Sequence, residues 1–271
     1  MKVSIVTISY NQARYLEQCI LSVLHQSYPN IEYIVVDPGS TDGSRDVIEK
    51  YRAHITSVIL DPDDGPADGL NKGFQNASGD VFGFLNSDDI LFPNAVSQIV
   101  QAFRKNPDVA VISGHGIVIN EDGRMCKRVF SHRFGLKAYA YGACTLVQQA
   151  TFFKRDQFLL VGGFNPVNHI SWDGELWVDL ALNGAKFSRI QAYLSNFRIY
   201  ENSITGSREY REKLQKEHLR ICKKIGINPQ SKLQRKAIWL FNRLSDPITT
   251  TLRFLDGFKN SRIELSAKDP R

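Results

Sequence analysis

The sequence lacks long apolar runs and has few cysteines. No stretch of its 271 residues approaches 18 uninterrupted apolar positions, so a membrane-spanning helix is not expected. The four cysteines, Cys19, Cys126, Cys144 and Cys222, lie far apart and form no CxxC pair, which argues against a zinc site and against a disulfide framework. The opening MKVSIVTISYN has one lysine and no small-residue cleavage site behind it, which is typical of a strand and not of a signal peptide. These absences predict a cytoplasmic protein.

The sequence also lacks the motifs of several enzyme classes. It contains no GxxxxGKS/T, which excludes a P-loop NTPase, and its loop GSTDGS lacks the GxGxxG spacing of a dinucleotide site. The six histidines show no HExxH, and GxSxG is absent, so histidine-ligated metal sites and nucleophilic hydrolases are disfavoured.

Positive charge is concentrated in the last quarter of the chain. The net charge is +6, but residues 208–271 hold 16 Lys and Arg against 7 Asp and Glu, whereas residues 1–207 hold 18 against 21. A basic segment on a slightly acidic body indicates an anionic partner for that segment, and a solvated helical face is the alternative. No nucleic-acid partner is expected.

Strand and helix patterns alternate through the first 110 residues, in a composition typical of a soluble globular protein. The predicted strands are 2–9, 31–37, 57–61 and 80–86, and the predicted helices are 12–26, 45–51, 67–77 and 93–106. This alternation predicts an α/β fold with a doubly wound, mostly parallel sheet. Functional residues are expected at the carboxyl ends of its strands. Later segments predict a hairpin turn at 120–123, a helix at 174–183 and charged helices after residue 207.

The strongest chemical pattern is LNSDD, at the end of the predicted strand 80–86. Asp88 and Asp89 follow the amide of Asn86, and carboxylate oxygens are ligands that Mg²⁺ and Mn²⁺ prefer. An N-terminal cap for the next helix is the alternative. Asp37 ends another predicted strand, and the loop after it can present backbone N–H groups to an anion.

A second acidic pair, Asp173 and Glu175, lies in the segment SWDGELW at the start of a predicted helix. A capping role is the usual one for an acid in this position. The two side chains would lie about 200° apart around the helix, so only one of them can face a bound ligand. The apolar neighbours Trp172, Leu176 and Trp177 could raise the pKa of a carboxylate toward that of a useful base.

Four ordered blocks, over roughly residues 2–200, together form a family pattern. The first two are VSIVTISYNQARYLEQCILSVLHQSYPNIEYIVVDPGSTDGS and DDGPADGLNKGFQNASGDVFGFLNSDD. The other two are QQATFFKRDQFLLVGGFN and SWDGELWVDLALNGAKF. The set resembles the inverting family 2 glycosyltransferases with the GT-A fold. Because the QxxRW signature of processive enzymes is missing, the chain is most similar to non-processive bacterial enzymes that build surface polysaccharides.

The resemblance implies roles for particular residues. It implies that the donor nucleotide is bound by Thr7, Ser9, Tyr10, Asn11 and Asp37. It implies a DxD-type role for Asn86, Ser87, Asp88 and Asp89, with Asp88 and Asp89 as metal ligands, and a catalytic base at Asp173. Lys72 could add a positive charge near the diphosphate, although a solvated helix lysine is equally compatible. Two positions depart from the family pattern: Asn86 replaces the first DxD acid, and Pro38 stands where many members have a second acid, which leaves the nucleotide open.

The implied activity is transfer of a sugar from a nucleotide-sugar donor, for which UDP is expected, with Mn²⁺ or Mg²⁺. The implied acceptor is a hydroxyl of a saccharide or a lipid-linked saccharide. Residues 1–207 would form the GT-A domain, with a nucleotide-sugar half to about residue 110 and an acceptor half over 111–207, and residues 208–271 a helical appendage. A nucleotidyltransferase that makes nucleotide sugars and a non-catalytic sugar- or lipid-binding subunit are the alternatives. The missing GxGTR-type loop argues against the first, and the retained acids argue against the second.

The C-terminal region mixes apolar and basic residues. Its segments IWLFNRL and ITTTLRFLDGF carry Ile238, Trp239, Phe241, Leu244, Leu252, Phe254, Leu255 and Phe258 among basic side chains. That mixture is typical of an interfacial helix on an anionic membrane, which would make the protein peripheral on the inner face. A helical appendage packed on the body or on another subunit is the alternative. The sequence does not determine the oligomeric state.

Overall fold

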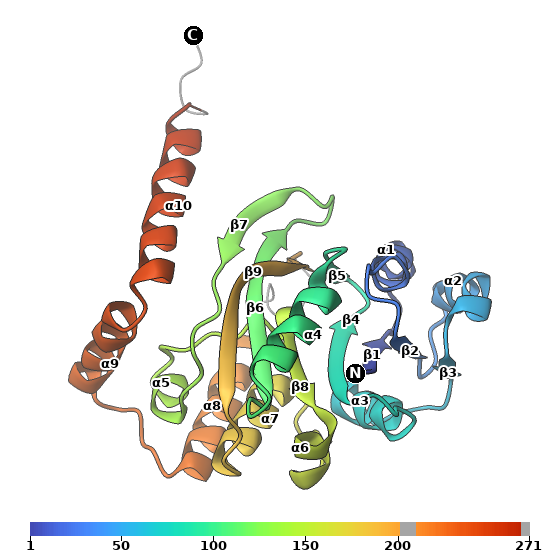
Figure 1. The fold of residues 1–271 in the computed structure, drawn as a ribbon, viewed down its shortest axis with the longest axis horizontal. Helices are drawn as coiled ribbons and strands as arrows, with labels where there is room; N and C mark the ends of the chain where they lie inside the picture. The colour runs from blue at the N-terminus through green and yellow to red at the C-terminus, as the bar shows by residue number, and fades with distance from the viewer. Residues whose placement is uncertain (201–209, 267–271) are drawn as a thin grey trace.

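The computed structural model of the chain describes residues 1–200 and 210–266. These residues form one sheet of nine strands, in the order β3-β2-β1-β4-β8-β6-β9-β5, with β7 paired to β6 (Figure 1). The strands are β1 (Val3–Ile8), β2 (Ile31–Val36), β3 (Ser57–Ile59), β4 (Val81–Asn86), β5 (Ile90–Leu91), β6 (Val111–Ile119), β7 (Met125–Val129), β8 (Thr151–Lys154) and β9 (Phe187–Arg198).

Helices cover both faces of this sheet. The helices are α1 (Ala13–Leu24), α2 (Ser44–Lys50), α3 (Pro66–Gln75), α4 (Ala95–Lys105), α5 (Leu136–Ala140), α6 (Arg155–Leu160), α7 (Trp172–Leu182), α8 (Tyr210–Ile225), α9 (Lys232–Leu244) and α10 (Pro247–Ser266). Helices α1, α2 and α4 share one apolar core with the sheet, and α3, α6 and α7 share the other. Because both faces are covered, β1, β2 and β4 are almost continuously apolar, as expected for parallel strands inside an α/β protein.

The first half of the sheet has the predicted parallel arrangement, and the second half is mixed. Strand β1 pairs in parallel with β2 and β4, and β2 pairs in parallel with β3. Strand β8 runs antiparallel to both β4 and β6, which are its neighbours. An antiparallel strand needs no crossover helix. The strand–helix alternation that predicts parallel pairing is therefore missing from the second half of the sheet. The predicted hairpin turn at 120–123 joins β6 to β7.

A buried carboxylate on α7 is one of the contacts that hold helix α8 on the body. The side chain of Glu175, on α7, is 1% exposed and accepts hydrogen bonds from both terminal nitrogens of Arg220 on α8. Lys224, one turn later on α8, lies 3.3 Å from the same carboxylate. Burial opposes the charge of Glu175, but Arg220 and the amides of Asn165 and Asn168 lower its pKa to about 2. A buried carboxylate paired in this way stays ionised at neutral pH.

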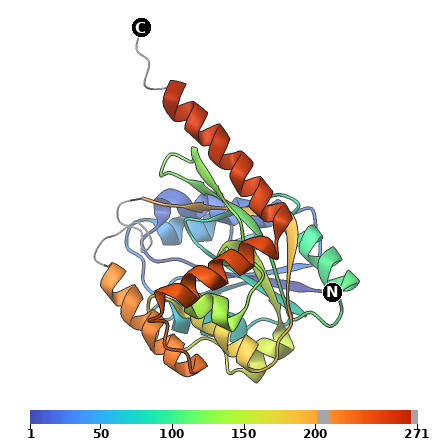
Figure 2. The same cartoon turned by 90° about the vertical axis from the view of Figure 1, so that its left-hand side faces the viewer.

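Helices α9 and α10 lie along the outside of the body, and both views show α10 extending beyond it (Figures 1 and 2). One side of α9 contacts the body: Gln234 accepts a hydrogen bond from Tyr141, and Asn242 donates one to the carbonyl of Ala143. The opposite side is exposed, with Leu233 78% and Leu244 72% accessible. The helices thus pack on the body, as the appendage alternative expects, and they also expose apolar side chains. Phe258 lies outside the described side chains.

No helix in the described part of the chain is both long and apolar enough to cross a bilayer.

Replacing Glu175 by glutamine is expected to destabilise the protein by about 3 kcal/mol at pH 7, because the pKa of Glu175 is lowered from 4.5 to about 2. The stabilisation is complete above pH 4.5 and is lost as the pH falls toward 2, so the two proteins should become equally stable in acid. Thermal melts from pH 7 to pH 3 measure this. Glu217→Gln is the control, since Glu217 binds the same Arg220 at 2.8 Å but is 28% exposed; its effect should be below about 1 kcal/mol. Equal losses in both variants would contradict the assignment.

Candidate active site

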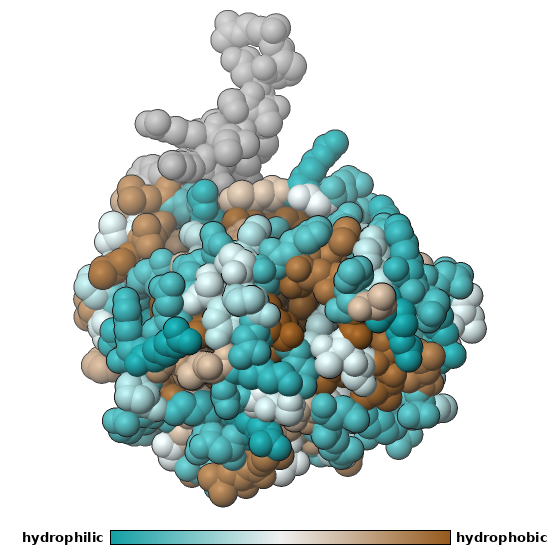
Figure 3. Space-filling view, turned by 45° about the vertical axis from the view of Figure 1, so that its right-hand side comes forward, coloured by the Kyte–Doolittle hydropathy of each residue, from teal (hydrophilic) through white to brown (hydrophobic). Residues whose placement is uncertain are grey.

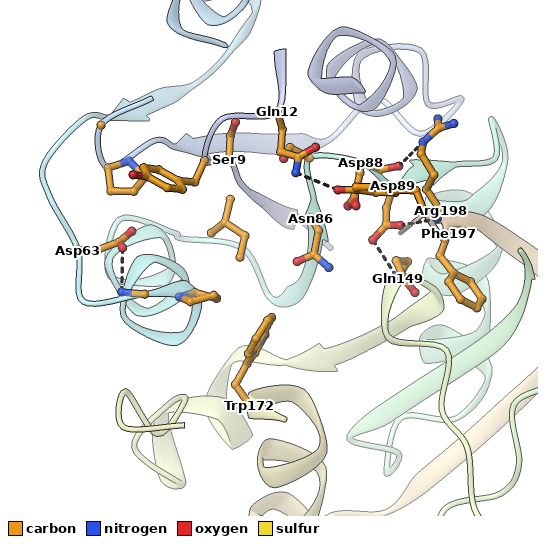
Figure 4. A pocket seen from close by; sticks show the side chains of 18 residues that line it. Ser9, Gln12, Asp63, Asn86, Asp88, Asp89, Gln149, Trp172, Phe197 and Arg198 are labelled. Atoms are coloured by element: carbon orange, nitrogen blue, oxygen red, sulfur yellow. Dashed lines mark hydrogen bonds between the residues drawn. The ribbon is translucent and has the colours of Figure 1, made fainter. Parts of the chain in front are cut away.

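A cavity of about 610 Å³ lies at the carboxyl ends of β1 and β4. It is lined by six of the residues predicted from the sequence: Ser9, Tyr10, Asn86, Ser87, Asp88 and Asp89. It is also lined by Asp63, which follows a predicted strand, and by side chains that the sequence did not predict: Gln12, Gln149, Trp172, Phe197, Arg198 and Tyr200. Figure 4 shows that these side chains converge from opposite sides of the cavity. Figure 3 shows a largely hydrophilic face of the molecule with apolar side chains recessed near its centre.

Four predicted donor residues lie outside the cavity lining: Thr7, Asn11, Asp37 and Lys72. Thr7 is fully buried, and its hydroxyl accepts a hydrogen bond from Tyr33 at 3.0 Å, inside the sheet. Lys72 donates to the carbonyl of Pro62 at 2.6 Å and lies 2.9 Å from Asp68, one turn earlier on α3. The ammonium group of Lys72 therefore stabilises its own helix and loop. Thr7 supports the strand that leads into the cavity.

Asn11 connects the two loops that follow β1 and β2. Its backbone N–H donates to Ser40 at 2.8 Å, and its side-chain oxygen accepts from the backbone of Thr41 at 2.9 Å. Asn11 has a φ of 51°, a left-handed conformation that asparagine tolerates better than most residues. Its role here is to hold the two loops together, not to line the cavity.

Asp37 is fully buried at the end of β2, next to Pro38 and Gly39, which line the cavity. One carboxylate oxygen accepts hydrogen bonds from the backbone of Ser40 at 2.8 Å and from Arg45 at 3.2 Å. The other oxygen is buried and has no hydrogen-bond partner among the described residues. An unpaired buried carboxylate oxygen is costly, so Asp37 retains a capacity to accept a hydrogen bond from a ligand.

The two acids after β4 have different surroundings. Asp89 is 2% exposed, and its two oxygens accept from Gln149 at 2.7 Å and from the backbone of Arg198 at 3.2 Å. Asp88 is less buried and accepts a hydrogen bond from Tyr200. Burial raises the pKa of both carboxyls, and for Asp89 the neighbouring charge of Asp88 raises it further. Asp88 is therefore the acid with more capacity to bind a ligand.

A metal ion in this cavity would need further ligands from the donor. In the part of the chain that the structure describes, no three His, Cys, Asp or Glu side chains are placed to hold an ion together. The carboxylate of Asp88, that of Asp89 and the amide of Asn86 do fit a hard cation. Mg²⁺ is commonly held by one or two carboxylates together with substrate phosphates. The donor set is thus compatible with an ion that arrives with a nucleoside diphosphate.

Arg198, at the end of β9, holds the loop of Asp88 and Asp89 in place. It is 4% exposed and donates to the carbonyls of Asp88 at 3.2 Å and Asn120 at 3.0 Å, and to the side chain of Gln18 at 3.0 Å. The sequence carries no signal for this role, because FRIY matches no motif and its partners are 78 to 180 positions away. Gln149 has a weaker signal, since it belongs to the block QQATFFK that carries the family resemblance.

Asp63 lines the cavity from the loop before α3 and accepts from the backbone of Gly65 at 2.9 Å. Burial raises the pKa of its carboxyl. A Cβ at position 69 would lie 2.5 Å from Asp63 Oδ2. Any residue larger than glycine at this position would therefore displace the carboxylate of Asp63. The sequence places Asp63 at the end of a predicted strand but carries no motif that would identify its role.

Helix α7 borders the cavity from the opposite side. Trp172 lines the cavity (Figure 4). Asp173, the next residue, is half-buried and is not part of the lining. Burial raises the pKa of Asp173. Glu175 points to α8, where Arg220 binds it. Glu175 therefore faces α8 and not the cavity, and its lowered pKa makes it a poor proton acceptor.

Replacing Arg198 by lysine is expected to destabilise the protein by about 3 kcal/mol. The ammonium group of lysine cannot donate to all the oxygens that accept from the guanidinium, so some buried acceptors would lose their hydrogen bonds. Urea unfolding measures the loss. Arg14→Lys is the matched control: Arg14 also lies over the ring of Tyr15, at 5.2 Å against 4.4 Å for Arg198, but its side chain is 61% exposed. The control should change the free energy of unfolding by less than about 0.5 kcal/mol. A tolerated Arg198→Lys would contradict the positioning role.

Known proteins resemble this chain in sequence. TuaG of Bacillus subtilis (strain 168), a glycosyltransferase named for teichuronic acid biosynthesis, is 27% identical over 217 residues, which cover 76% of this chain and 82% of TuaG. The uncharacterised glycosyltransferase alr2836 of Nostoc sp. is 38% identical over 125 residues, which cover 45% of this chain and 39% of alr2836. The chain therefore spans less than half the length of the second relative.

Solved structures resemble it in fold. TarS of S. aureus in complex with UDP-GlcNAc superposes with a TM-score of 0.69 at 19% identity, over 90% of this chain and 73% of that chain. The mannosyltransferase PcManGT of Pyrobaculum calidifontis, in complex with GDP-Man and Mn²⁺, gives 0.65 at 18% identity, over 88% and 68%. These likenesses confirm the predicted GT-A fold. The model of glycosyl transferase family 2 matches residues 4–158, which is more than half of the sequence. This chain belongs to glycosyl transferase family 2.

Proposed function

We propose that this glycosyltransferase moves a sugar from a UDP-linked donor to a hydroxyl of a saccharide or lipid-linked saccharide, with inversion, in the synthesis of a surface polysaccharide. The observation that carries the proposal is a single cavity lined by Asp88 on one side and by Trp172, next to Asp173, on the other. The nucleotide-sugar complexes of TarS and PcManGT support the donor class, and the name of TuaG supports the polysaccharide. Membership of a glycosyltransferase family argues against a nucleotidyltransferase.

Residues 1–110 are proposed as the nucleotide-sugar half and residues 111–207 as the acceptor half. The first half supplies Ser9, Tyr10 and Asp88 to the cavity, and the second supplies Gln149 and Trp172. The proposed boundary with the basic region 208–271 falls in residues 201–209, which lie outside the described residues.

Ser9 and Asp37 are the proposed contacts for the nucleoside. The hydroxyl of Ser9 is buried in the cavity wall without a hydrogen-bond partner among the described residues. Oδ2 of Asp37 is also buried and unpaired among these residues, and it lies next to Pro38 and Gly39 of the cavity lining. Both groups can accept a hydrogen bond, and N–H and O–H donors are what a nucleobase and a ribose offer. Tyr10 is 62% exposed at the cavity rim, where its ring can pack against a bound base.

Asp88 and Asp89 are the proposed metal ligands. When bound, Mn²⁺ or Mg²⁺ stabilises the negative charge that grows on the leaving diphosphate. The protein's contribution is to hold the two carboxylates in place: Arg198 and Gln149 fix Asp89, and Tyr200 contacts Asp88.

Asp173 is the proposed base. The acceptor hydroxyl loses its proton as it attacks the anomeric carbon, and a carboxylate on the face opposite the leaving group can accept it. The raised pKa of Asp173 makes it a stronger proton acceptor than an exposed aspartate. A single base and direct displacement lead to inversion at the anomeric carbon.

The donor assignment is tested by a thermal-shift screen of nucleotide sugars with and without Mn²⁺, since a ligand that binds only the folded state raises the melting temperature. UDP-sugars should give the largest shift, and the shift should depend on the metal. A shift only with other nucleotides would exclude UDP, and release of pyrophosphate from a nucleoside triphosphate would favour the nucleotidyltransferase.

Asp88→Asn should abolish the metal-dependent part of donor binding and lower turnover at least about a hundredfold, because the amide cannot neutralise a divalent cation. Calorimetric titration of UDP-sugar with and without Mn²⁺ separates binding from chemistry. Asp64→Asn is the control, as Asp64 is an exposed acid in the loop beside the cavity. Full wild-type activity in EDTA is the result that would overturn the metal assignment.

Asp173→Asn should leave donor binding intact and lower kcat at least about a hundredfold, because it keeps the size of the side chain and removes the proton acceptor. The acid limb of the wild-type pH profile should lie above the range of an exposed aspartate, since burial raises the pKa of Asp173 and the base works only when ionised. The variant should lack this limb. An active Asp173→Asn beside an inactive, folded Glu175→Gln would assign the base to Glu175.

We also propose that the basic region 208–271 brings the enzyme to an anionic membrane surface, where a lipid-linked acceptor would be found. Support comes from exposed apolar side chains on α9 and α10, which lie beside basic residues.

A further inference from the structure

A second cavity, of about 520 Å³, lies between β7, the loop around Ala143, and helices α9 and α10. It shares no lining residue with the donor cavity. Its lining includes five basic or titratable nitrogen groups and one indole: Lys127, Arg128, His132, Arg243, Arg253 and Trp239. Only one acid, Asp256, is part of the lining.

Most of the positive charge in this cavity is not neutralised. Asp256 is paired with Arg128 at 2.5 Å. Lys127 and Arg243 have no carboxylate within ion-pair distance in the described ranges, and neither has Arg253. Arg253 instead donates to the carbonyl of Phe130 at 2.9 Å and approaches the ring of His132 at 3.5 Å. The cavity therefore carries an excess of three positive charges.

The nearest other acid is already paired as well. Asp246 binds Arg189 at 2.5 Å. Burial and the charge of Arg253 lower the pKa of His132 to about 4, so this imidazole is neutral; its Nδ1 accepts from the backbone of Thr145, which leaves its Nε2–H to donate one hydrogen bond. Burial and the charges of Arg243 and Arg189 lower the pKa of Arg253. Positive side chains that are held close together repel one another, and a bound anion relieves this repulsion.

The geometry of the basic groups suits a phosphate. Arg243 stacks on the ring of Trp239 with its guanidinium carbon 3.6 Å from the ring centroid, which fixes the direction of its N–H groups. The guanidinium of Arg253 is held in place by its hydrogen bond to the carbonyl of Phe130. Guanidinium groups held in a fixed orientation match the oxygens of a phosphate in two-point hydrogen bonds.

The side of α9 next to the cavity indicates what kind of molecule carries this phosphate. At 100° per residue, Leu233, Leu240 and Leu244 fall within about 40° of one another, and Phe241 continues the same side. They are 78, 53, 72 and 69% exposed. Three residues of α9 line the cavity: Trp239 and Arg243 lie on the side adjacent to these leucines, and Asn242 lies on the side that contacts the body. An apolar side next to a basic side is the arrangement of a helix that lies at the boundary between lipid headgroups and acyl chains.

We propose that this cavity binds the phosphate of an anionic membrane lipid while Leu233, Leu240, Phe241 and Leu244 of α9 enter the bilayer interface. The cavity supplies three unneutralised cations at the headgroup level, and α9 supplies the apolar contact beside them. A soluble phosphate would use the cations and leave the apolar side uncovered. The site is separate from the donor cavity and does not depend on the proposed sugar transfer.

The test is flotation of the full chain with vesicles of phosphatidylglycerol and phosphatidylcholine, and with phosphatidylcholine alone, at low salt. Lys127→Gln with Arg243→Gln removes two cavity charges that make no ion pair in the described structure. Arg104→Gln with Lys105→Gln removes two exposed charges from the end of α4 and is the matched control. Each basic residue near an anionic surface strengthens binding about fivefold, so the cavity variant should bind anionic vesicles about 30-fold more weakly and the control should bind like the wild type.

Two further measurements distinguish a lipid phosphate from a soluble phosphate. Leu240→Ser with Leu244→Ser should also weaken vesicle binding while leaving the titration of inorganic phosphate unchanged. Wild-type protein that binds inorganic phosphate but remains in the soluble fraction with anionic vesicles would overturn the lipid assignment. Equal flotation of the cavity variant and the α4 control would overturn the site itself. Melting temperatures with and without UDP-sugar, measured on the same variants, show whether fold and donor binding are intact, so that failure here is distinguishable from failure of the proposed transfer.

Discussion

The buried guanidinium of Arg198 is the interaction on which the candidate active site depends. Each of its three nitrogens has an oxygen acceptor, and these acceptors come from α1, from the loop after β4 and from the β6–β7 hairpin. Elements that are far apart in the sequence therefore meet at one side chain. Its backbone N–H also binds Asp89, so the last residue of β9 fixes both the main chain and a carboxylate of the loop that the family resemblance identifies with metal binding. Lysine could not satisfy this set, because it lacks the planar fork.

Parallel strands explain why the remaining groups gather at the same edge. The carboxyl ends of β1, β2 and β4 lie side by side in register, with Ile8 opposite Val36 on one side and Asn86 on the other. Whatever follows these three residues is therefore brought to one edge of the sheet. This places Ser9, Asp37 and Asp88 near one another although about 25 to 80 positions separate them in the chain.

The sequence predicts the parts of the fold and site that depend on local pattern. Four strands and four helices of residues 1–110, the hairpin turn after β6 and the loop Asn86–Asp89 all follow from apolar periodicity and turn residues, whereas the two-residue strand β5 was not predicted. The mixed half of the sheet could not be predicted, because β8 pairs with strands on both sides without any helix to mark the connection. Nor could the roles of Arg198, Gln149 and Tyr200, since each acts through contacts with residues far away in the sequence. Thr7 and Lys72 show the opposite case: a family position is retained, but its side chain is satisfied within the protein.

Helix α7 carries the candidate base on one side and the attachment of α8 on the other. Asp173 and Glu175 are separated by one residue, and Glu175 holds Arg220 and Lys224 through a buried carboxylate. The basic C-terminal region is thus connected to the helix of Asp173 without passing through the sheet. The same short helix therefore supplies Trp172 to the wall of the cavity and the carboxylate against which the first helix of the C-terminal region packs.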